Sequence, residues 1–236
     1  MSEIKKSKTV NVQFNEFQIF SSLLSANSEK CALMIHGGAR HQDIFLNLRH
    51  WLCEHLSIGS IAFDCIGHGQ SEGQFSDSSL SQRTQQAIKV IQNYHAKVNI
   101  CIGVSMGAYN AIQLSRLLKL DTLILIVPGI YTPSAYHVNF GEKFSAIIRT
   151  ENSWIDSDAW EILSTFKGKL LIVSAENDEV VPSAIPQKLY ESATNTLWKH
   201  HMIVPNAIHQ KFMEYVWNNE NIKEEFLELL LHCVSN

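Results

Sequence analysis

The chain has 236 residues, of which 45% are hydrophobic and 18% charged, and its formal net charge is −4 at pH 7. This length predicts a single domain, residues 1–236, with a sizeable core. The weakly acidic balance gives no electrostatic basis for binding nucleic acid or an anionic membrane surface. No apolar segment follows the lysines near the N-terminus, and none reaches the roughly 18 residues that a membrane span needs. We therefore expect a cytoplasmic protein without membrane insertion, and the sequence leaves its oligomeric state open.

The cysteines and histidines do not form the patterns of a disulfide-bonded or metal-binding protein. The five cysteines are odd in number and widely spaced, without a Cys-x-x-Cys pair, which argues against a disulfide framework or a zinc site. His200 and His201 are adjacent in a predicted strand, so they face opposite ways and cannot bind one metal together. We expect neither a metal nor a cofactor.

Short apolar runs alternate with longer helical patterns, which is typical of strand–helix–strand crossovers around a parallel sheet. The first two strands have polar residues that suit an exposed edge, and Asn15 and Glu16 form the turn between them. The predicted strands are residues 9–14, 18–24, 31–35, 58–63, 98–102, 122–127, 169–174 and 202–204. The predicted helices are residues 43–55, a helix capped by Ser78 or Ser79 that ends near residue 94, 106–118, and 209–234 with Asn218 and Asn219 as candidate breaking residues. This order predicts an α/β fold with a mostly parallel central sheet of about eight strands and helices on both faces.

The fifth predicted strand leads into Gly103-Val104-Ser105-Met106-Gly107, a Gly-x-Ser-x-Gly sequence at the start of a helical stretch. A serine on such a tight turn is held in strained backbone geometry with its hydroxyl outside the sheet. Gly103 and Gly107 supply the room that the turn needs. Ser105 is therefore a candidate nucleophile, although a glycine-flanked turn with a capping serine would give the same pattern.

A serine nucleophile needs a base, an acid that orients the base, and hydrogen-bond donors for an oxyanion. Asp178 directly follows the seventh predicted strand and is favoured as the acid over its neighbours Glu176 and Glu179. His209 lies in the loop after the last short strand and is favoured as the base. All three candidates therefore follow the carboxyl ends of strands.

Between the sixth and seventh strands, at about residues 128–166, the alternation of strands and helices is interrupted. A structureless loop of this length is uncommon in a compact domain, so we expect a short inserted cap made of two short helices or a lid. Its six aromatic residues predict an apolar acyl or aryl pocket of modest size, although each of them could equally pack the cap onto the body. They are Tyr131, Tyr136, Phe140, Phe144, Trp154 and Trp160.

Three further motifs occur in the same order as the strands. They are His36-Gly37-Gly38 after the third strand, Asp64-Cys65-Ile66-Gly67-His68-Gly69-Gln70-Ser71 after the fourth, and Asn177-Asp178-Glu179-Val180-Val181-Pro182 after the seventh. With the order Ser105, Asp178, His209, the chain over nearly its whole length resembles the α/β-hydrolase-fold serine hydrolases, which include small esterases, lipase-like and thioesterase-like members.

The resemblance also implies roles for individual residues. The oxyanion donors would be the backbone N–H groups of Met106 and of Gly38, or of Ala39 one step later. His36 and His68 would brace their loops by hydrogen bonds and would not transfer protons. The chain departs from the family pattern at Ala175, where the acid loop usually begins with glycine.

On this basis we expect a serine hydrolase that cleaves carboxylic esters or thioesters of small to medium apolar acyl or aryl groups through an acyl-enzyme at Ser105. The expected partner is a small-molecule ester. One alternative is an aminopeptidase or amidase of the same fold, in which Glu142, Glu151 or Asp156 would hold a substrate amine. The other is a binding or signalling module that has the fold without turnover.

Overall fold

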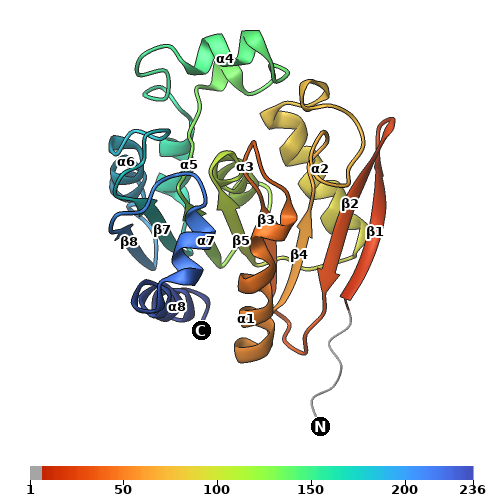
Figure 1. The fold of residues 1–236 in the computed structure, drawn as a ribbon, viewed down its shortest axis with the longest axis vertical. Helices are drawn as coiled ribbons and strands as arrows, with labels where there is room; N and C mark the ends of the chain where they lie inside the picture. Colours follow the sequence, from red (N-terminus) through yellow and green to blue (C-terminus); the bar gives the residue numbers. More distant parts are fainter. Residues whose placement is uncertain (1–6, 236) are drawn as a thin grey trace.

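The structure is a computed structural model that describes residues 7–235. Its centre is one eight-stranded sheet with the order β1-β2-β4-β3-β5-β6-β7-β8 (Figure 1). β2 pairs antiparallel with both β1 and β4, and all the other pairs are parallel. The strands are β1 (Ser7–Phe14), β2 (Phe17–Leu24), β3 (Cys31–Ile35), β4 (Gly59–Phe63), β5 (Ile100–Val104), β6 (Thr122–Ile126), β7 (Lys169–Ala175) and β8 (Trp198–Val204). The mostly parallel α/β sheet predicted from the sequence is thus confirmed.

Helices cover both faces of this sheet. They are α1 (Leu46–Leu56), α2 (Leu80–Asn93), α3 (Met106–Ser115), α5 (Ala159–Thr165), α6 (Ala184–Ser192), α7 (Phe212–Asn218) and α8 (Glu220–Val234). One face carries α1, α7 and α8, and the other carries α2, α3, α5 and α6. Alternate strand residues point to opposite faces. Ile100 and Ile102 of β5 therefore belong to the core under α1, α7 and α8, and Cys101 belongs to the core under α2, α3, α5 and α6.

The segment between β6 and β7 contains two short elements in addition to α5, namely η3 (Pro133–Ala135) and α4 (Glu142–Ile148). In Figure 1, α4 stands apart from the sheet at the top of the molecule. α5 instead packs against α3 and α6, within the helical layer of the body. The part that stands outside this layer is therefore η3, α4 and their connecting loops.

Several boundaries differ from the sequence-based expectation. β5 runs to Val104, the residue before Ser105, and β8 begins at Trp198 because its polar first half gives no apolar signal. The predicted C-terminal helical stretch breaks at Asn219, one of its two candidate breaking residues. Asn219, with φ −114°, separates α7 from α8, and its side-chain amide donates to the Tyr215 carbonyl at 2.7 Å. The cap of α2 is Ser79, whose hydroxyl accepts from Gln82 N at 3.2 Å.

Within residues 7–235, no helix is long and apolar enough to cross a membrane. All five cysteines are free thiols. The described part of the chain also holds no group of three His, Cys, Asp or Glu side chains placed to bind a metal ion.

Candidate active site

Ser105 occupies the tight turn between β5 and α3, with φ 53° and ψ −119°. This backbone conformation is rare for a residue that has a side chain. The turn also requires its two glycines, because a Cβ at Gly103 would lie 2.3 Å from Gly107 O and a Cβ at Gly107 would lie 2.1 Å from Ile35 O. Strand and helix thus approach each other more closely than any larger residue would permit.

Three side chains from distant parts of the sequence form a hydrogen-bonded relay. Ser105 Oγ lies 3.0 Å from His209 Nε2, and His209 Nδ1 lies 2.9 Å from Asp178 Oδ2. Asp178 follows β7 and His209 follows β8, so two adjacent parallel strands bring them together. The side chains of His209 and Asp178 are 13% and 8% exposed, which shields the relay from bulk water. Such a relay can take the hydroxyl proton onto the imidazole and hold the resulting cation against the carboxylate.

The environment of Asp178 keeps its carboxylate charged. Burial by itself raises its pKa, but a hydrogen bond from His209 and two from the N–H groups of Val181 and Val180 outweigh burial. The pKa of Asp178 therefore lies below its usual value.

The two carboxylates that compete with Asp178 in the sequence lie elsewhere. Glu176 Oε2 accepts from Asn206 N at 2.8 Å, and Glu179 is exposed. The hydrogen bond to His209 belongs to Asp178.

The loop after β3 packs against the turn that holds Ser105. A Cβ on Gly37 would lie 3.1 Å from Ser105 Cβ, and a Cβ on Gly38 would lie 3.2 Å from Met106 Cε. Met106 is the first residue of α3, where an N–H group has no intrahelical acceptor. No backbone hydrogen bond within residues 7–235 uses the N–H group of Gly38 or Met106. Both groups can therefore bond to an oxygen beside Ser105.

Two histidines connect the loops around this turn. His36 Nε2 accepts from Cys65 N at 2.9 Å, so His36 is neutral with its proton on Nδ1, which lies 2.6 Å from Gly37 O. Burial lowers the pKa of His36 well below its usual value. His68 Nε2 lies 2.6 Å from Gly38 O. Both side chains thus bond to backbone atoms of the loops, as the family resemblance implies.

Asp64 fixes the loop after β4. Its Oδ1 accepts from Gln42 N at 2.8 Å and its Oδ2 from Gln70 N at 2.9 Å. Gly69, with φ +53°, leaves room for this carboxylate, since a Cβ there would lie 2.1 Å from Asp64 Oδ2. The motif from Asp64 to Ser71 therefore serves loop geometry and does not contact the relay.

A cavity of about 790 Å³ opens beside Ser105 and His209. Its walls come from the loop after β3, from η1 (Gln42–Phe45) and the start of α1, from α7, and from the segment between β6 and β7. The larger apolar wall residues are Ile44, Phe75, Val104, Met106, Val127, Tyr131, Val180, Phe212, Met213 and Trp217. The charged wall residues are Arg40, Asp43, Arg149, Lys211 and Glu214. The cavity is therefore mainly apolar, with charges of both signs.

Residues 26–155 match the model of a protein family described as serine aminopeptidase, S33. The chain belongs to this family. It is a hydrolase with the α/β-hydrolase fold, as the motif order predicts.

Three known proteins similar to this S33-family hydrolase have 16–24% sequence identity to it. An uncharacterized protein of Acanthamoeba polyphaga mimivirus, R595, is 24% identical over 224 residues, which cover 87% of this chain and 73% of that protein. Est1E from Butyrivibrio proteoclasticus, solved with ferulic acid bound, is 18% identical with a TM-score of 0.69, covering 93% of this chain and 98% of that one. The monoacylglycerol lipase of Paleococcus ferrophilus is 16% identical with a TM-score of 0.68, covering 91% and 97%. At these identities the two solved structures show a shared fold.

The six aromatic residues of the cap segment in this S33-family hydrolase lie in different surroundings. Of the six, Tyr131 lines the cavity beside Ser105, whereas the other five are not among the residues that line it. Phe140 and Phe144 are each 2% exposed and pack edge-on against each other. Tyr136 donates to Thr84 Oγ1 at 3.2 Å. These three side chains anchor the segment to the body and leave the cavity to other residues.

The two cap tryptophans form a separate surface cluster. Trp154 and Trp160 meet edge-on, and the Lys188 ammonium lies 5.6 and 4.6 Å from their ring centres. The cavity instead uses Phe75 and Trp217, which the sequence did not single out. The sequence locates aromatic residues along the chain, whereas the direction of each ring depends on packing.

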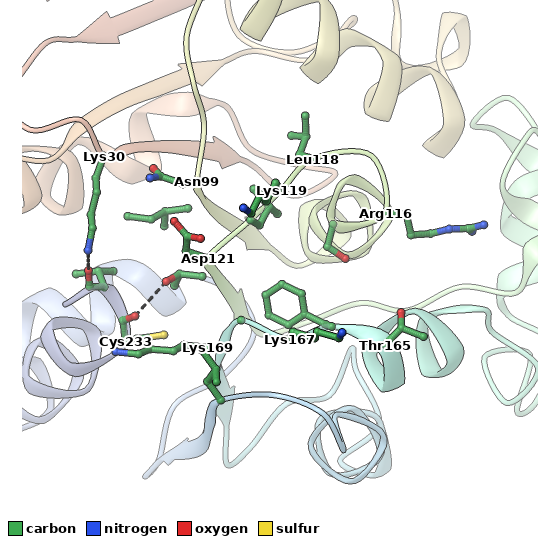
Figure 2. A pocket seen from close by; sticks show the side chains of 18 of the residues that line it. Lys30, Asn99, Arg116, Leu118, Lys119, Asp121, Thr165, Lys167, Lys169 and Cys233 are labelled. Carbon is green, nitrogen blue, oxygen red and sulfur yellow. Dashed lines mark hydrogen bonds between the residues drawn. The ribbon is translucent and has the colours of Figure 1, made fainter. Parts of the chain in front are cut away.

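A second cavity, of about 560 Å³, lies at the amino ends of β5, β6 and β7 (Figure 2). Its lining includes Lys30 and Lys169, which donate to backbone carbonyls at the end of α8: Lys30 Nζ lies 2.6 Å from Val234 O, and Lys169 Nζ lies 2.7 Å from Ser235 O. These two cations therefore cap a helix. The relay of Ser105, His209 and Asp178 is at the opposite ends of the strands.

Proposed function

We propose that this hydrolase is a serine esterase that cleaves carboxylic esters, or thioesters, of small to medium apolar acyl or aryl groups. The observation that carries the proposal is the hydrogen-bonded relay of Ser105, His209 and Asp178 at the edge of a mainly apolar cavity. The catalytic residues would be these three, with the N–H groups of Gly38 and Met106 as oxyanion donors.

In the first half of the reaction, Ser105 Oγ attacks the ester carbonyl carbon while His209 Nε2 takes the hydroxyl proton. The carbonyl electron pair moves onto oxygen, and the N–H groups of Gly38 and Met106 bond to the resulting oxyanion. When the tetrahedral intermediate collapses, the bond to the leaving oxygen or sulfur breaks. His209 then donates its proton to that atom, which releases an alcohol or thiol and leaves an acyl-enzyme.

In the second half, water replaces Ser105 as the nucleophile. His209 takes one water proton as the water oxygen attacks the acyl carbon, and the same two N–H groups bond to the second oxyanion. Collapse breaks the bond to Ser105 Oγ, which recovers its proton from His209, and the carboxylic acid leaves. Asp178 stays charged throughout and stabilises the imidazolium that forms twice in each cycle.

The surroundings of the site support an apolar acyl or aryl group. Phe75 and Val180 line the cavity and are 37% and 55% exposed, and Ile208, next to His209, is 49% exposed. Exposed apolar side chains beside a cavity favour ligands that bury apolar surface. Two relatives in fold, Est1E with ferulic acid bound and a monoacylglycerol lipase, are in keeping with such substrates.

The test compares two serines that both contact a histidine. We expect Ser105→Ala to abolish hydrolysis of p-nitrophenyl acetate and butyrate while the protein stays folded. Ser174 Oγ lies 2.7 Å from His201 Nε2 in β7 and β8, so Ser174→Ala is a matched control that should keep its activity. A fluorophosphonate should label Ser105 and not Ser174. Unchanged turnover in Ser105→Ala would overturn the proposal, and a folded wild type that is neither active nor labelled would favour the non-catalytic module.

The family description favours aminopeptidase activity as a second candidate. Such an enzyme needs a carboxylate beside the scissile bond to hold the substrate amine. Asp43 and Glu214 line the cavity, whereas Glu142, Glu151 and Asp156 are not among its lining residues. Aminoacyl p-nitroanilides compared with p-nitrophenyl esters distinguish the two candidates. Faster anilide cleavage that Glu214→Gln or Asp43→Asn selectively lowers would establish the aminopeptidase.

A further inference from the structure

Arg83 of α2 is a cation buried behind the two segments that carry the oxyanion donors. Its side chain is 0% exposed. The guanidinium donates to the carbonyl of His36, which precedes Gly37 and Gly38, and to Met106 Sδ at 3.2 Å. One side chain therefore links the loop after β3 to the first residue of α3.

The positive charge of Arg83 has no carboxylate partner. No ion pair within residues 7–235 includes it, and its Nε has no hydrogen-bond partner in that part of the chain. Removing a guanidinium from water is costly unless an anion or good hydrogen bonds compensate. A neutral side chain could connect the same two loops at a lower cost, so the charge itself calls for a function.

The field of Arg83 extends to the cavity. Tyr131, which lines the cavity, has its pKa raised by burial to about 12, and the Arg83 charge opposes this rise. The Arg83 charge also adds to burial in lowering the pKa of His36. In an interior of low dielectric, a fixed positive charge favours negative charge that develops nearby.

We propose that Arg83 is a positioning residue of the oxyanion hole. It fixes the N–H groups of Gly38 and Met106 relative to each other, and its charge favours the oxyanion over the neutral ester. The inference rests on the proposed esterase function, because it needs an oxyanion to form beside Ser105. Arg83 would not touch the substrate, and it acts through Met106 and through the loop that begins at His36.

The test separates binding of a neutral carbonyl from binding of an oxyanion. A trifluoromethyl ketone forms a hemiketal oxyanion on a reactive serine, whereas the matching methyl ketone stays a neutral carbonyl. In Arg83→Met, which keeps an unbranched side chain but removes the guanidinium and its charge, we expect kcat for p-nitrophenyl acetate to fall at least about 10-fold with KM nearly unchanged. The Ki of the trifluoromethyl ketone should rise by a similar factor, and that of the methyl ketone should stay the same. Arg83→Lys should lie between Arg83→Met and the wild type.

A second buried arginine provides the control for stability. Arg49 is 5% exposed and bonds to Ser22 and Ser60, away from the relay. Arg49→Met should lower the Tm without changing the ratio of the two ketone inhibition constants. If Arg83→Met does not fold, Arg83→Lys alone decides, because it keeps the charge but cannot reproduce the two-armed contact with His36 and Met106.

The outcomes distinguish this inference from the proposed function. If the wild type hydrolyses esters but folded Arg83→Met keeps its kcat and ketone selectivity, the Arg83 inference fails alone. Loss of kcat without loss of ketone selectivity would also overturn it, because the defect would not concern the oxyanion. If Arg83→Lys is the only variant that folds, wild-type kcat and wild-type ketone selectivity in it would overturn the positioning role of the contact with His36 and Met106. A wild type without turnover or serine labelling would overturn the proposed function itself.

Discussion

Asp178 uses its two carboxylate oxygens for two purposes. Oδ1 accepts from the N–H groups of Val180 and Val181, and Oδ2 accepts from His209 Nδ1. The backbone contacts fix the carboxylate, and the fixed carboxylate keeps the His209 proton on Nδ1 so that Nε2 can accept from Ser105. The orientation of the base thus depends on hydrogen bonds made by the loop after β7.

We expect Asp178→Asn to lower kcat for p-nitrophenyl acetate by about 10³- to 10⁴-fold with little change in KM, because an amide can donate to Nδ1 and stabilise the wrong tautomer. Glu176→Gln, two positions away, should keep wild-type kcat since Glu176 bonds to Asn206 N. Circular dichroism would check that both variants fold. Equal losses in the two variants would argue against Asp178 as the orienting acid.

The buried His36 makes the free energy of unfolding depend on pH. Its pKa in the folded protein lies well below the ordinary value of 6.5, so below pH 6.5 the unfolded chain binds more protons than the folded one. The related stabilisation is complete above pH 6.5 and is lost as the pH falls from 6.5 towards the folded pKa. The slope from one such group is at most about 1.4 kcal/mol per pH unit.

Urea denaturation between pH 7.5 and pH 5 would measure this slope. We expect His36→Gln, which can still accept from Cys65 N, to flatten the decline in unfolding free energy below pH 6.5. Burial also lowers the pKa of His201, so His201→Gln should flatten the remaining slope in the same direction. If the slope in His36→Gln equals that of the wild type, folding does not lower the pKa of His36.

Among the elements, those that position Ser105, Asp178 and His209 could be predicted because each of these residues follows a strand at a recognisable boundary. β5 and β7 are buried on both faces and read as apolar runs, each followed by a motif. The cavity wall could not be predicted. Its largest contribution comes from α7, and helical spacing alone does not show which side chains of this helix face the cavity. Arg83 is one polar residue among several in α2, and only packing shows that it is buried.

Trp217 of α7 lines the cavity, and this position predicts a change in substrate preference. We expect Trp217→Ala to raise the ratio of kcat/KM for p-nitrophenyl octanoate over acetate by about 10-fold, since each methylene that enters an apolar pocket adds binding energy. Trp160→Ala is the control, because Trp160 packs on Trp154 and is absent from the lining of the cavity. An altered ratio in Trp160→Ala alone would instead locate the acyl group under the cap.

At the scale of the whole molecule, two cores share one sheet. Cys101 of β5 lies in the core beneath α3, and Cys233 of α8 lies in the core on the opposite face. Lys30 and Lys169 hold the last carbonyls of α8 against the starts of β3 and β7. Because every central strand contributes residues to both cores, neither core can open fully while the other stays intact. This coupling is the physical basis for expecting a single cooperative domain.

Thiol labelling tests this coupling, because a buried thiol reacts only after the protein opens. Burial raises the pKa of Cys233 to about 12 and that of Cys101 also rises, so both should resist labelling in the native state at pH 8. In increasing urea, mass spectrometry after a labelling pulse should give Cys101 and Cys233 the same midpoint and the same urea dependence. Complete unfolding in denaturant should expose all five cysteines and provides the reference for full labelling. Labelling of Cys233 at a clearly lower urea concentration than Cys101 would mean that α8 detaches first, and that the core under α1, α7 and α8 opens separately from the sheet.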